Sequence, residues 1–355
     1  MNNAPAAELM PLLGETRQLG LISATRFKSL MVKFLARRLL SIFISLVGAT
    51  IFIFILTRLG PDPLTLYIGD AQVELSEEQI QLIKEQLGLD KNLPMQYLTW
   101  VWNLIQFDMG QSIGTLRPVS EIIRIHIAVT LILAAGAWLF AITVGISIGI
   151  LAAVKRATFW DYVGRTFALM GQATPQFWSG VLAIFFFAVL LREWTGFDFF
   201  PTGGIGEYDG FPLHWGNAKY YILPCIVLGW PASASIMRLT RSSMLEILDS
   251  EFIKLARAKG VNPVTVIWKH GLRNAVIPPL TSALVLLADY LNGALVVEII
   301  FSLPGIGTVA LNQAVYDNDW PLLAGTVFVF LGIYVTFAFL ADILYALIDP
   351  RIRYE

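Results

Sequence analysis

The sequence has 355 residues, a net charge of -1 and a mean hydropathy of +0.66, with 56% hydrophobic and 14% charged residues. Soluble domains contain about 25% charged residues, so this composition excludes an ordinary soluble domain and indicates a membrane protein. The single cysteine, Cys225, excludes a disulfide framework and a cysteine-based metal site. The three histidines are widely separated and lack an H-E-x-x-H pattern, so we expect no metal site.

Residues 1–32 are weakly patterned and lack the short apolar core of a signal peptide, so we interpret them as a cytoplasmic N-terminal extension. The first transmembrane helix is expected within residues 33–58, where Leu39–Thr57 is free of charge. About 20 residues of helix span the hydrocarbon core of a bilayer. Basic residues precede this run and few follow it, which places the N-terminus inside.

Residues 59–125 are polar and are expected to form an external (periplasmic) subdomain. Acidic residues dominate there: the stretch 58–125 contains nine Asp or Glu and five Lys or Arg. The segment is too short to build an independent core, so it must rest on the membrane helices.

The remaining chain, residues 126–348, is expected to be a transmembrane domain of five helices, followed by a cytoplasmic C-terminus at 349–355. The expected spans are Ile127–Val154, Thr166–Leu191, Tyr220–Met237, Ala275–Ile300 and Trp320–Ile348. With this topology, 18 of the 25 Lys and Arg residues lie inside and 7 lie outside, which is the positive-inside bias. We therefore predict an all-α polytopic membrane protein with six transmembrane helices and both termini cytoplasmic.

One polar segment, residues 250–277, interrupts the apolar second half on the cytoplasmic side. It contains five basic residues and a single acid, Glu251. Gly260 suits the left-handed position that ends a helix. Asn262 is a good N-cap and Pro263 a good first helical residue, so a second helix can begin at once. Two short helices with a break between them, too polar to insert into the membrane, are suited to binding a soluble partner protein.

Small residues and prolines within the spans bear on how the helices pack. Gly145 and Gly149 are four residues apart and would permit a close helix crossing, although small residues are common in membrane helices. Pro175, Pro224 and Pro231 lie in or at the edges of spans. Freed backbone groups in lipid must be covered by protein or water, so these prolines favour a bundle that contains a cavity.

Asp289 lies near the middle of the fifth expected span, close to Asn292. An acid at that depth usually faces a bundle interior or a wet cavity. Two interpretations stay open: the pair lines a translocation path, or it lies at a helix or subunit interface. Glu298 and Asp342 are nearer to span ends, where a structural role is expected.

No catalytic motif accounts for the chain. No nucleophile–base arrangement is visible, and no G-x-x-x-x-G-K-[ST] loop is present to bind ATP phosphates. If transport is powered, the energy must enter through a partner. Three functions remain possible at this point: a passive pore, a secondary transporter, or the membrane subunit of a transporter that a partner drives.

The cytoplasmic segment distinguishes between these alternatives. Its stretches Leu255–Gly260, His270–Ala275 and Ile277-Pro278 resemble the "EAA" loop of ABC-importer permeases, in the form found in the peptide/nickel branch. Further matches to that branch are Arg37-Arg38-Leu39, Gly60-Pro61-Asp62-Pro63, Leu87-Gly88-Leu89-Asp90, Thr174-Pro175-Gln176-Phe177, Phe199 with Pro201-Thr202-Gly203, Val297-Glu298 with Phe301-Ser302, Pro304, Gly305 and Gly307, and Asp349-Pro350-Arg351. The resemblance covers about residues 33–353.

The resemblance implies the type I importer (MetI-like) permease fold and the first, B-type, permease subunit of a dipeptide or oligopeptide importer in a bacterial inner membrane. It implies a second homologous permease, two cytoplasmic ATPase subunits and an external binding protein as partners, with no cofactor and no nucleic acid. The chain itself would be non-catalytic. The ATPase-coupling residues would be Leu255, Ala256, Arg257, Ala258, Lys259, Gly260 and Pro263.

Two features of the match restrict what the resemblance implies. The glutamate that names the EAA motif is replaced here by Lys254, and the Ile277-Pro278 pair lies farther from Gly260 than in the original motif. Nickel or another small solute is the alternative cargo, because a separate binding protein selects it. An autonomous channel or secondary transporter is the alternative from another class.

Overall fold

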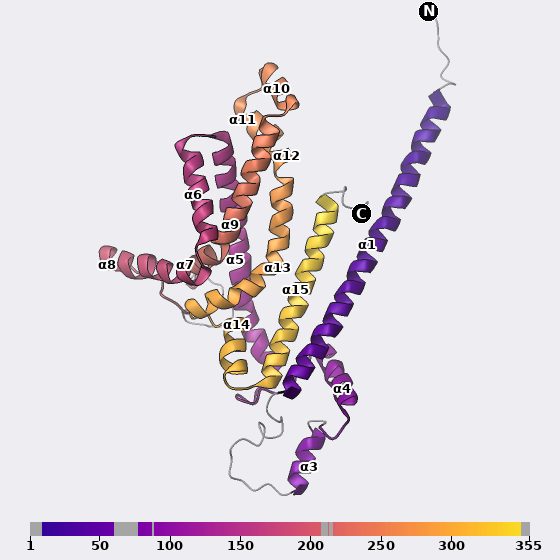
Figure 1. The fold of residues 1–355 in the computed structure, drawn as a ribbon, viewed down its shortest axis with the longest axis vertical. Helices are drawn as coiled ribbons and strands as arrows, with labels where there is room; N and C mark the ends of the chain where they lie inside the picture. Colours follow the sequence, from indigo (N-terminus) through magenta and orange to yellow (C-terminus); the bar gives the residue numbers. More distant parts are fainter. Residues whose placement is uncertain (1–8, 60–76, 87–88, 207–211, 213–215, 349–355) are drawn as a thin grey trace, which may run out of the picture.

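The computed structural model describes residues 9–59, 77–86, 89–206, 212 and 216–348, and this part of the chain is mostly helical (Figure 1). The α-helices are α1 (Leu9–Leu59), α3 (Glu77–Gln86), α4 (Leu93–Ile105), α5 (Val119–Val154), α6 (Phe159–Ala173), α7 (Gln176–Ala183), α8 (Leu191–Thr195), α9 (Ala218–Leu248), α10 (Glu251–Ala258), α11 (Pro263–Thr265), α12 (Arg273–Ala275), α13 (Ile277–Ile300), α14 (Ile306–Val309) and α15 (Trp320–Ile348). Three π-helical segments join them: η1 (Ile184–Leu190), η2 (Val266–Leu272) and η3 (Ala310–Val315). Between residues 111 and 118 lies an isolated antiparallel bridge.

Five helical stretches among the described residues are long and apolar enough to cross a membrane: Leu35–Leu59 of α1, α5, Gln176–Thr195, α9 and Trp320–Leu344 of α15. A sixth helix, α13, coincides closely with the fifth predicted span, Ala275–Ile300. The count of six transmembrane helices stays a prediction.

The prediction of one continuous third span over Thr166–Leu191 is wrong. Helix α6 ends at Ala173, Thr174 is extended with ψ 124°, and α7 begins after Pro175. Proline disfavours the helical conformation of the residue before it, which explains the break. Helices α7 and α8 then run away from the upright bundle as a side arm (Figure 1).

Two other expected boundaries fall inside helices. Helix α5 begins at Val119, so residue 126 does not separate the external subdomain from the transmembrane domain. Helix α1 is unbroken from Leu9 to Leu59, so the backbone of residues 9–32 belongs to the same helix as the first candidate span, Leu35–Leu59. The C-terminal segment 349–355 lies outside the described residues.

The core of the bundle is the contact between α5 and α9, the most extensive between any two described elements. A Cβ added at Gly145 would lie 2.7 Å from the carbonyl oxygen of Ser233, and one at Gly149 would lie 2.6 Å from Cβ of Thr240. The close crossing predicted from these two glycines is confirmed. Close backbone approach of this kind drives helix association in lipid through van der Waals packing.

The beginning of α1, the end of α15 and all of α10 lie at one end of the bundle, which we call the α10 end (Figure 1). The turn before α14 and the start of α15 lie towards the other end, which we call the α14 end. Both ends contain buried polar contacts, but their construction differs.

At the α14 end, the carboxylate of Glu298 is fully buried at the start of α14. It accepts hydrogen bonds from Oγ1 of Thr130 at 2.5 Å and from the backbone N–H of Thr308 at 3.1 Å. Thr130 Oγ1 in turn accepts from the N–H of Ile306 at 3.0 Å. A Cβ at Gly305 would lie 2.2 Å from the carboxylate, so glycine is what allows the chain to wrap around it. The carboxylate thus lies at the N-terminus of α14, where an acid is favourable.

A second buried acid at this end, Asp319, caps α15. Its Oδ1 accepts from the N–H of Leu322 at 3.1 Å. Its Oδ2 accepts from Oγ of Ser112 at 2.5 Å and from the N–H of Gly114 at 3.2 Å. The loop before α5 is thereby joined to the start of α15, more than 200 residues later in the sequence.

Candidate coupling site

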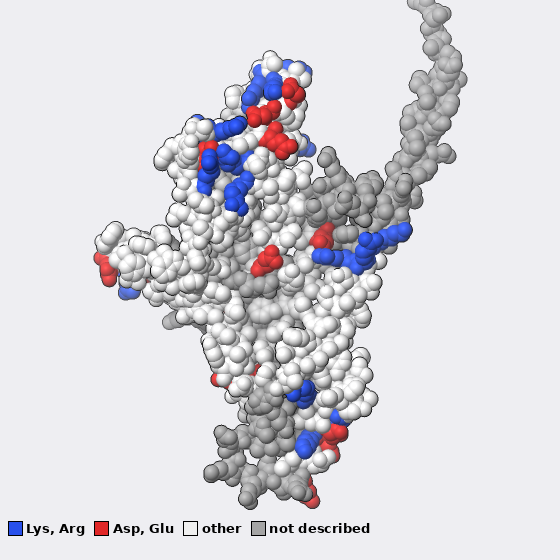
Figure 2. Space-filling view, viewed as in Figure 1, with Lys and Arg blue, Asp and Glu red and all other residues white. Residues whose placement is uncertain are grey.

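The candidate site is the segment 250–277 between α9 and α13, at the α10 end of the bundle (Figure 1). Helix α10 begins after Ser250, whose backbone is extended with ψ 156°. Lysine and arginine side chains gather at this end, whereas the middle of the same face is mostly uncharged (Figure 2). The polar segment identified in the sequence is therefore a tip that projects beyond the apolar bundle.

Helix α10 ends in a left-handed turn at Gly260, where φ is 74°. The N–H of Gly260 donates to the carbonyl of Arg257, and the N–H of Val261 donates to that of Ala256. This pair of bonds is the Schellman arrangement, which satisfies the last free carbonyls of a helix. A Cβ at Gly260 would meet no atom within 4 Å, so the requirement for glycine comes from the backbone angle. The predicted left-handed turn is confirmed.

The second helix begins as the sequence predicts. Oδ1 of Asn262 accepts from the N–H of Val264 at 2.9 Å, and Pro263 occupies the first turn. Helix α11 is short, and the chain continues through the π-helical η2 and α12 into α13. The predicted helix-break-helix is thus present, with a π-helical segment in its second half.

Exposed apolar side chains cover the outward side of this tip. Phe252 is 45% exposed, Leu255 57%, Val264 62% and Trp268 57%. Arg257 and Lys259 are also exposed, and Ala256 is half-buried. An apolar patch rimmed by basic groups is typical of a surface that another protein covers.

The inward side of the segment is fastened to α5 and α9. Ile253 is fully buried, as are Val266 and Ala275. Ala275 belongs to a cluster with Met244 and Leu248 of α9 and residues near the end of α5. Displacing this segment therefore requires that the end of α9 moves with it.

Lys254, which stands in place of the motif glutamate, pairs within its own helix. Its Nζ lies 2.8 Å from Oε1 of Glu251, three residues earlier. Both side chains are more than half exposed, so the pair contributes little to stability. Within this chain Lys254 is partnered by Glu251.

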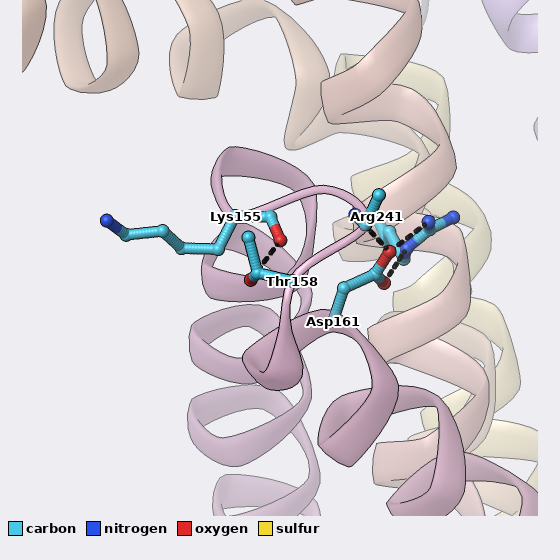
Figure 3. Close-up of polar contacts among 5 residues, drawn as sticks. Lys155, Thr158, Asp161 and Arg241 are labelled. Carbon is cyan, nitrogen blue, oxygen red and sulfur yellow. Dashed lines mark hydrogen bonds and ion pairs between the residues drawn. The ribbon is translucent and has the colours of Figure 1, made fainter.

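A buried ion pair braces α9 just before the coupling segment (Figure 3). Nε of Arg241 lies 2.7 Å from Oδ1 of Asp161, and its second guanidinium nitrogen lies 2.9 Å from Oδ2. Asp161 belongs to the first turn of α6 and is 1% exposed. It also accepts from the N–H of Ala157 at 3.0 Å, in the turn between α5 and α6. The bidentate bond thus ties that turn to α9.

The Arg241 hydrogen bond holds the pKa of the Asp161 carboxyl below its ordinary value, against the opposing effect of burial. The carboxylate is therefore charged at neutral pH and the pair is intact. A second, exposed contact between Arg156 and Asp249 at 3.6 Å joins the same turn to the residue that follows α9. The α5–α6 turn and the base of the coupling segment are held together at two points.

The two candidate pathway residues lie on α13, away from the coupling segment. The Asp289 side chain is exposed in the single chain, beside the buried Tyr290. The Asn292 side chain lies outside the described residues. The other two acids behave as structural groups: Glu298 caps α14, and Asp342 of α15 pairs with Arg38 of α1.

Sequence reasoning missed several residues of the site. Phe252, Val264 and Trp268 extend the exposed patch beyond the motif positions. The spacing of Phe252 and Leu255, three residues apart on one helix face, was a usable signal. The Asp161–Arg241 pair joins residues 80 positions apart, and no local pattern indicates such a contact.

Comparison with protein families agrees with this geometry. Residues 145–354, more than half of the chain, match the family described as binding-protein-dependent transport system inner membrane component, and residues 31–134 match the N-terminal part of such components. The chain belongs to this family of ABC-transporter permeases. The permease is therefore a multi-pass membrane protein and a transport component. The prediction of an all-α membrane permease agrees with the family and with the mostly helical structure of the described residues.

Curated relatives cover nearly the whole permease. A Brucella abortus protein described as a peptide transport system permease is 38% identical over 304 residues, which are 85% of this chain and 93% of the relative. A di/tripeptide transport system permease protein of Pseudomonas aeruginosa is 37% identical over 341 residues, 92% of this chain and 100% of the relative.

Solved structures are similar at lower identity. A methionine ABC transporter in inward-facing conformations has a TM-score of 0.49 and 17% identity, over 62% of this chain and 93% of the other. An amino acid ABC transporter crystallised with histidines has a TM-score of 0.48 and 14% identity, over 64% and 94%. Membership of the family implies ATPase and binding-protein partners in general.

Proposed function

We propose that this permease is a non-catalytic membrane subunit of an ATP-driven importer and forms part of the pathway for dipeptides and oligopeptides across a bacterial inner membrane. The names of its relatives support the cargo. Its partners are a second homologous permease, two cytoplasmic ATPase subunits and an external binding protein. ATP is bound and hydrolysed by the ATPase subunits.

The observation that carries this proposal is the projecting tip built from α10, the Gly260 turn and α11. It presents Phe252, Leu255 and exposed basic groups, while Ile253 fastens it to the bundle. We assign Leu255 to Gly260 and Pro263 as the residues that dock on an ATPase. Closure of the ATPase pair on ATP moves the tip, and the bundle changes between inward- and outward-open states, each stabilised by a different nucleotide state.

The arrangement of the termini supports the proposed topology. The beginning of α1 and the end of α15 lie at the same end as α10 (Figure 1). If that end is cytoplasmic, both termini are inside, and the third of the six proposed crossings begins with the upright α6, because α7 and α8 run sideways from the bundle (Figure 1). Single cysteines placed near α10 and near α4 test this orientation by their labelling with a membrane-impermeant reagent. We expect labelling only of the α4 site in intact cells.

Asp289 supports a pathway or an interface through α13. An exposed carboxylate at the depth of a membrane helix must face water or another subunit, because lipid would leave it unsolvated. We therefore propose that this side of α13 faces the second permease or the space between the two subunits.

The decisive experiment compares two glycines of the same geometry. Gly260 ends α10 with φ 74°, and Gly196 ends α8 with φ 72°; neither has an atom within 4 Å of an added Cβ. Valine strains both turns by roughly 1–2 kcal/mol. We expect Gly260→Val to abolish uptake of a labelled dipeptide and its stimulation of ATP hydrolysis, with normal membrane insertion. Gly196→Val should insert normally and keep its uptake.

Normal uptake and ATPase binding by Gly260→Val would overturn the coupling assignment. Equal loss of uptake in both variants would show that strain alone accounts for the defect. Uptake of nickel but not of peptide by the intact complex would show that the cargo is nickel rather than peptides. Transport by the permease alone in liposomes, without ATPase subunits, would make it a channel or secondary transporter.

A further inference from the structure

A basic pocket lies between α6 and α9, outside the coupling segment. It has a volume of about 390 Å³ and is lined by Tyr162, Arg165, Thr166, Leu169 and Arg238. Arg165 and Arg238 are exposed, and the Arg165 guanidinium lies over the Tyr162 ring at 5.5 Å from its centroid. Two cations and a hydroxyl therefore converge on one open concavity.

No acid occupies this pocket in the described part of the chain. Neither Arg165 nor Arg238 forms an ion pair there, and the nearby Asp161 is already bonded in bidentate fashion to Arg241. Guanidinium groups bind carboxylates and phosphates through planar pairs of hydrogen bonds. The pocket has donors for an anion that the described residues do not provide.

The surroundings indicate which anion this is. Exposed aromatic side chains, Phe159 and Trp160, lie at the start of α6, and exposed apolar ones, Leu169 and Met170, lie farther along it. Arg165 is six residues into the helix, roughly 9 Å along its axis. Aromatic side chains mark the headgroup level of a membrane helix, and an arginine one or two turns farther in extends its long side chain back towards that level. The ligand should therefore have an anionic head and an apolar tail.

We propose that this pocket binds the phosphate of an anionic phospholipid, such as phosphatidylglycerol or cardiolipin, in the leaflet at the α10 end. Arg165 and Arg238 hold the phosphate, and the acyl chain lies along Leu169. Basic pockets between membrane helices bind such headgroups. A bound lipid would bridge α6 and α9 close to the Asp161–Arg241 brace. The inference requires the α10 end to lie at a membrane surface, as in the proposed topology, but not the proposed cargo.

The test uses the full-length permease, purified and reconstituted in nanodiscs of phosphatidylcholine with or without phosphatidylglycerol. Retained lipid is measured by native mass spectrometry and stability by the midpoint of thermal unfolding. We expect phosphatidylglycerol to be retained and to raise the midpoint. The double variant Arg165→Gln with Arg238→Gln should bind it about tenfold more weakly or worse. Arg192→Gln, which removes an exposed arginine on α8, should behave as the unchanged protein.

A conservative variant separates loss of charge from misfolding. Arg165→Lys keeps the positive charge and should retain most of the lipid. Equal retention by the double variant and the unchanged protein would overturn the proposal. If inorganic phosphate raised the midpoint of thermal unfolding as much as phosphatidylglycerol does, the pocket would be assigned to a free anion instead. If a cysteine placed at position 169 by Leu169→Cys were protected from labelling only when the second permease is added, the pocket would be assigned to a protein partner. None of these measurements needs ATP hydrolysis or transport, so the outcome is separate from that of the proposed function.

Discussion

The two ends of the permease satisfy their polar groups in opposite ways. At the α14 end, Glu298 and Asp319 are buried and accept hydrogen bonds from Thr130, Ser112 and backbone N–H groups of distant segments. At the α10 end, the Asp161–Arg241 pair and the turn around Gly260 are closed internally, but apolar side chains at the tip such as Leu255 stay exposed. The buried acids of the α14 end are thus satisfied by distant parts of the same chain, whereas the tip of the α10 end presents groups that a partner can cover. Substitutions of the buried acids at either end should affect folding, and those at the exposed tip should affect assembly.

The largest effect is expected for Glu298→Ala. It leaves the Thr130 hydroxyl and the Thr308 N–H buried without their acceptor, at about 1–3 kcal/mol for each donor. We expect a clear fall in the midpoint of thermal unfolding, followed by tryptophan fluorescence in detergent. The control Glu121→Ala removes a half-exposed acid paired with Arg117 and should change the midpoint little. Equal midpoints of thermal unfolding for Glu298→Ala and Glu121→Ala would contradict the structural role of the buried Glu298.

Asp161→Asn should have the next largest effect. Breaking a buried pair costs about 3–5 kcal/mol, and we expect about 2–3 here because Arg241 is partly exposed. Since the folded pKa of Asp161 is lowered, its stabilisation is present above the unfolded value near 3.8 and disappears as pH falls through the folded pKa. The difference in unfolding midpoint between the two proteins should therefore be full at pH 7 and shrink below pH 3.8. A difference that is independent of pH would contradict the role of the charge.

Leu255→Ser tests the α10 end itself. The side chain is 57% exposed, so the unfolding midpoint should not change. Binding of the ATPase subunit, measured by co-purification and titration, should weaken by about 1–2 kcal/mol, which is about 5- to 30-fold. Leu82→Ser removes a leucine of equal exposure on α3 and should leave binding intact. Weaker binding in both variants would show that the effect is not specific to the tip.

The smallest effect is expected for Lys254→Ala. Its ion pair with Glu251 is exposed and should contribute less than about 0.5 kcal/mol to stability. Uptake and ATPase affinity should be close to those of the unchanged permease. A large loss of ATPase affinity would mean that Lys254 leaves Glu251 and binds an acid of the partner.

Local signals in the sequence were sufficient for part of this structure. Gly260, Asn262 and Pro263 each act through their own backbone or nearest neighbours, so the turn and the restart of the helix could be predicted. The break at Pro175 had the same local cause, but the apolar run across it favoured a continuous span. The Glu251–Lys254 pair could also have been read from its spacing on one helix.

Other features depend on segments that meet only in the folded bundle. Glu298 is separated from Thr130 by 168 positions, and Arg241 from Asp161 by 80. The depth of Glu298 in its span indicated a structural role without indicating its partner. Family resemblance predicted the coupling residues, but the exposure of Phe252 and Trp268 follows from packing that no short pattern encodes.

The two prolines inside α9 give this helix an uneven stiffness. Each lacks the N–H that would close a backbone hydrogen bond, and Pro224 and Pro231 both lie in its first half. The part after Pro231, about 25 Å long, is clamped by α5 and by Arg241 and continues into the coupling segment. This part of α9 can move as a rigid lever, because the helix bends most easily at the two prolines. A tilt of about 5° would displace the far end of the lever by about 2 Å. Movement of the ATPase subunits would therefore bend α9 near the middle of the membrane rather than at the docking site.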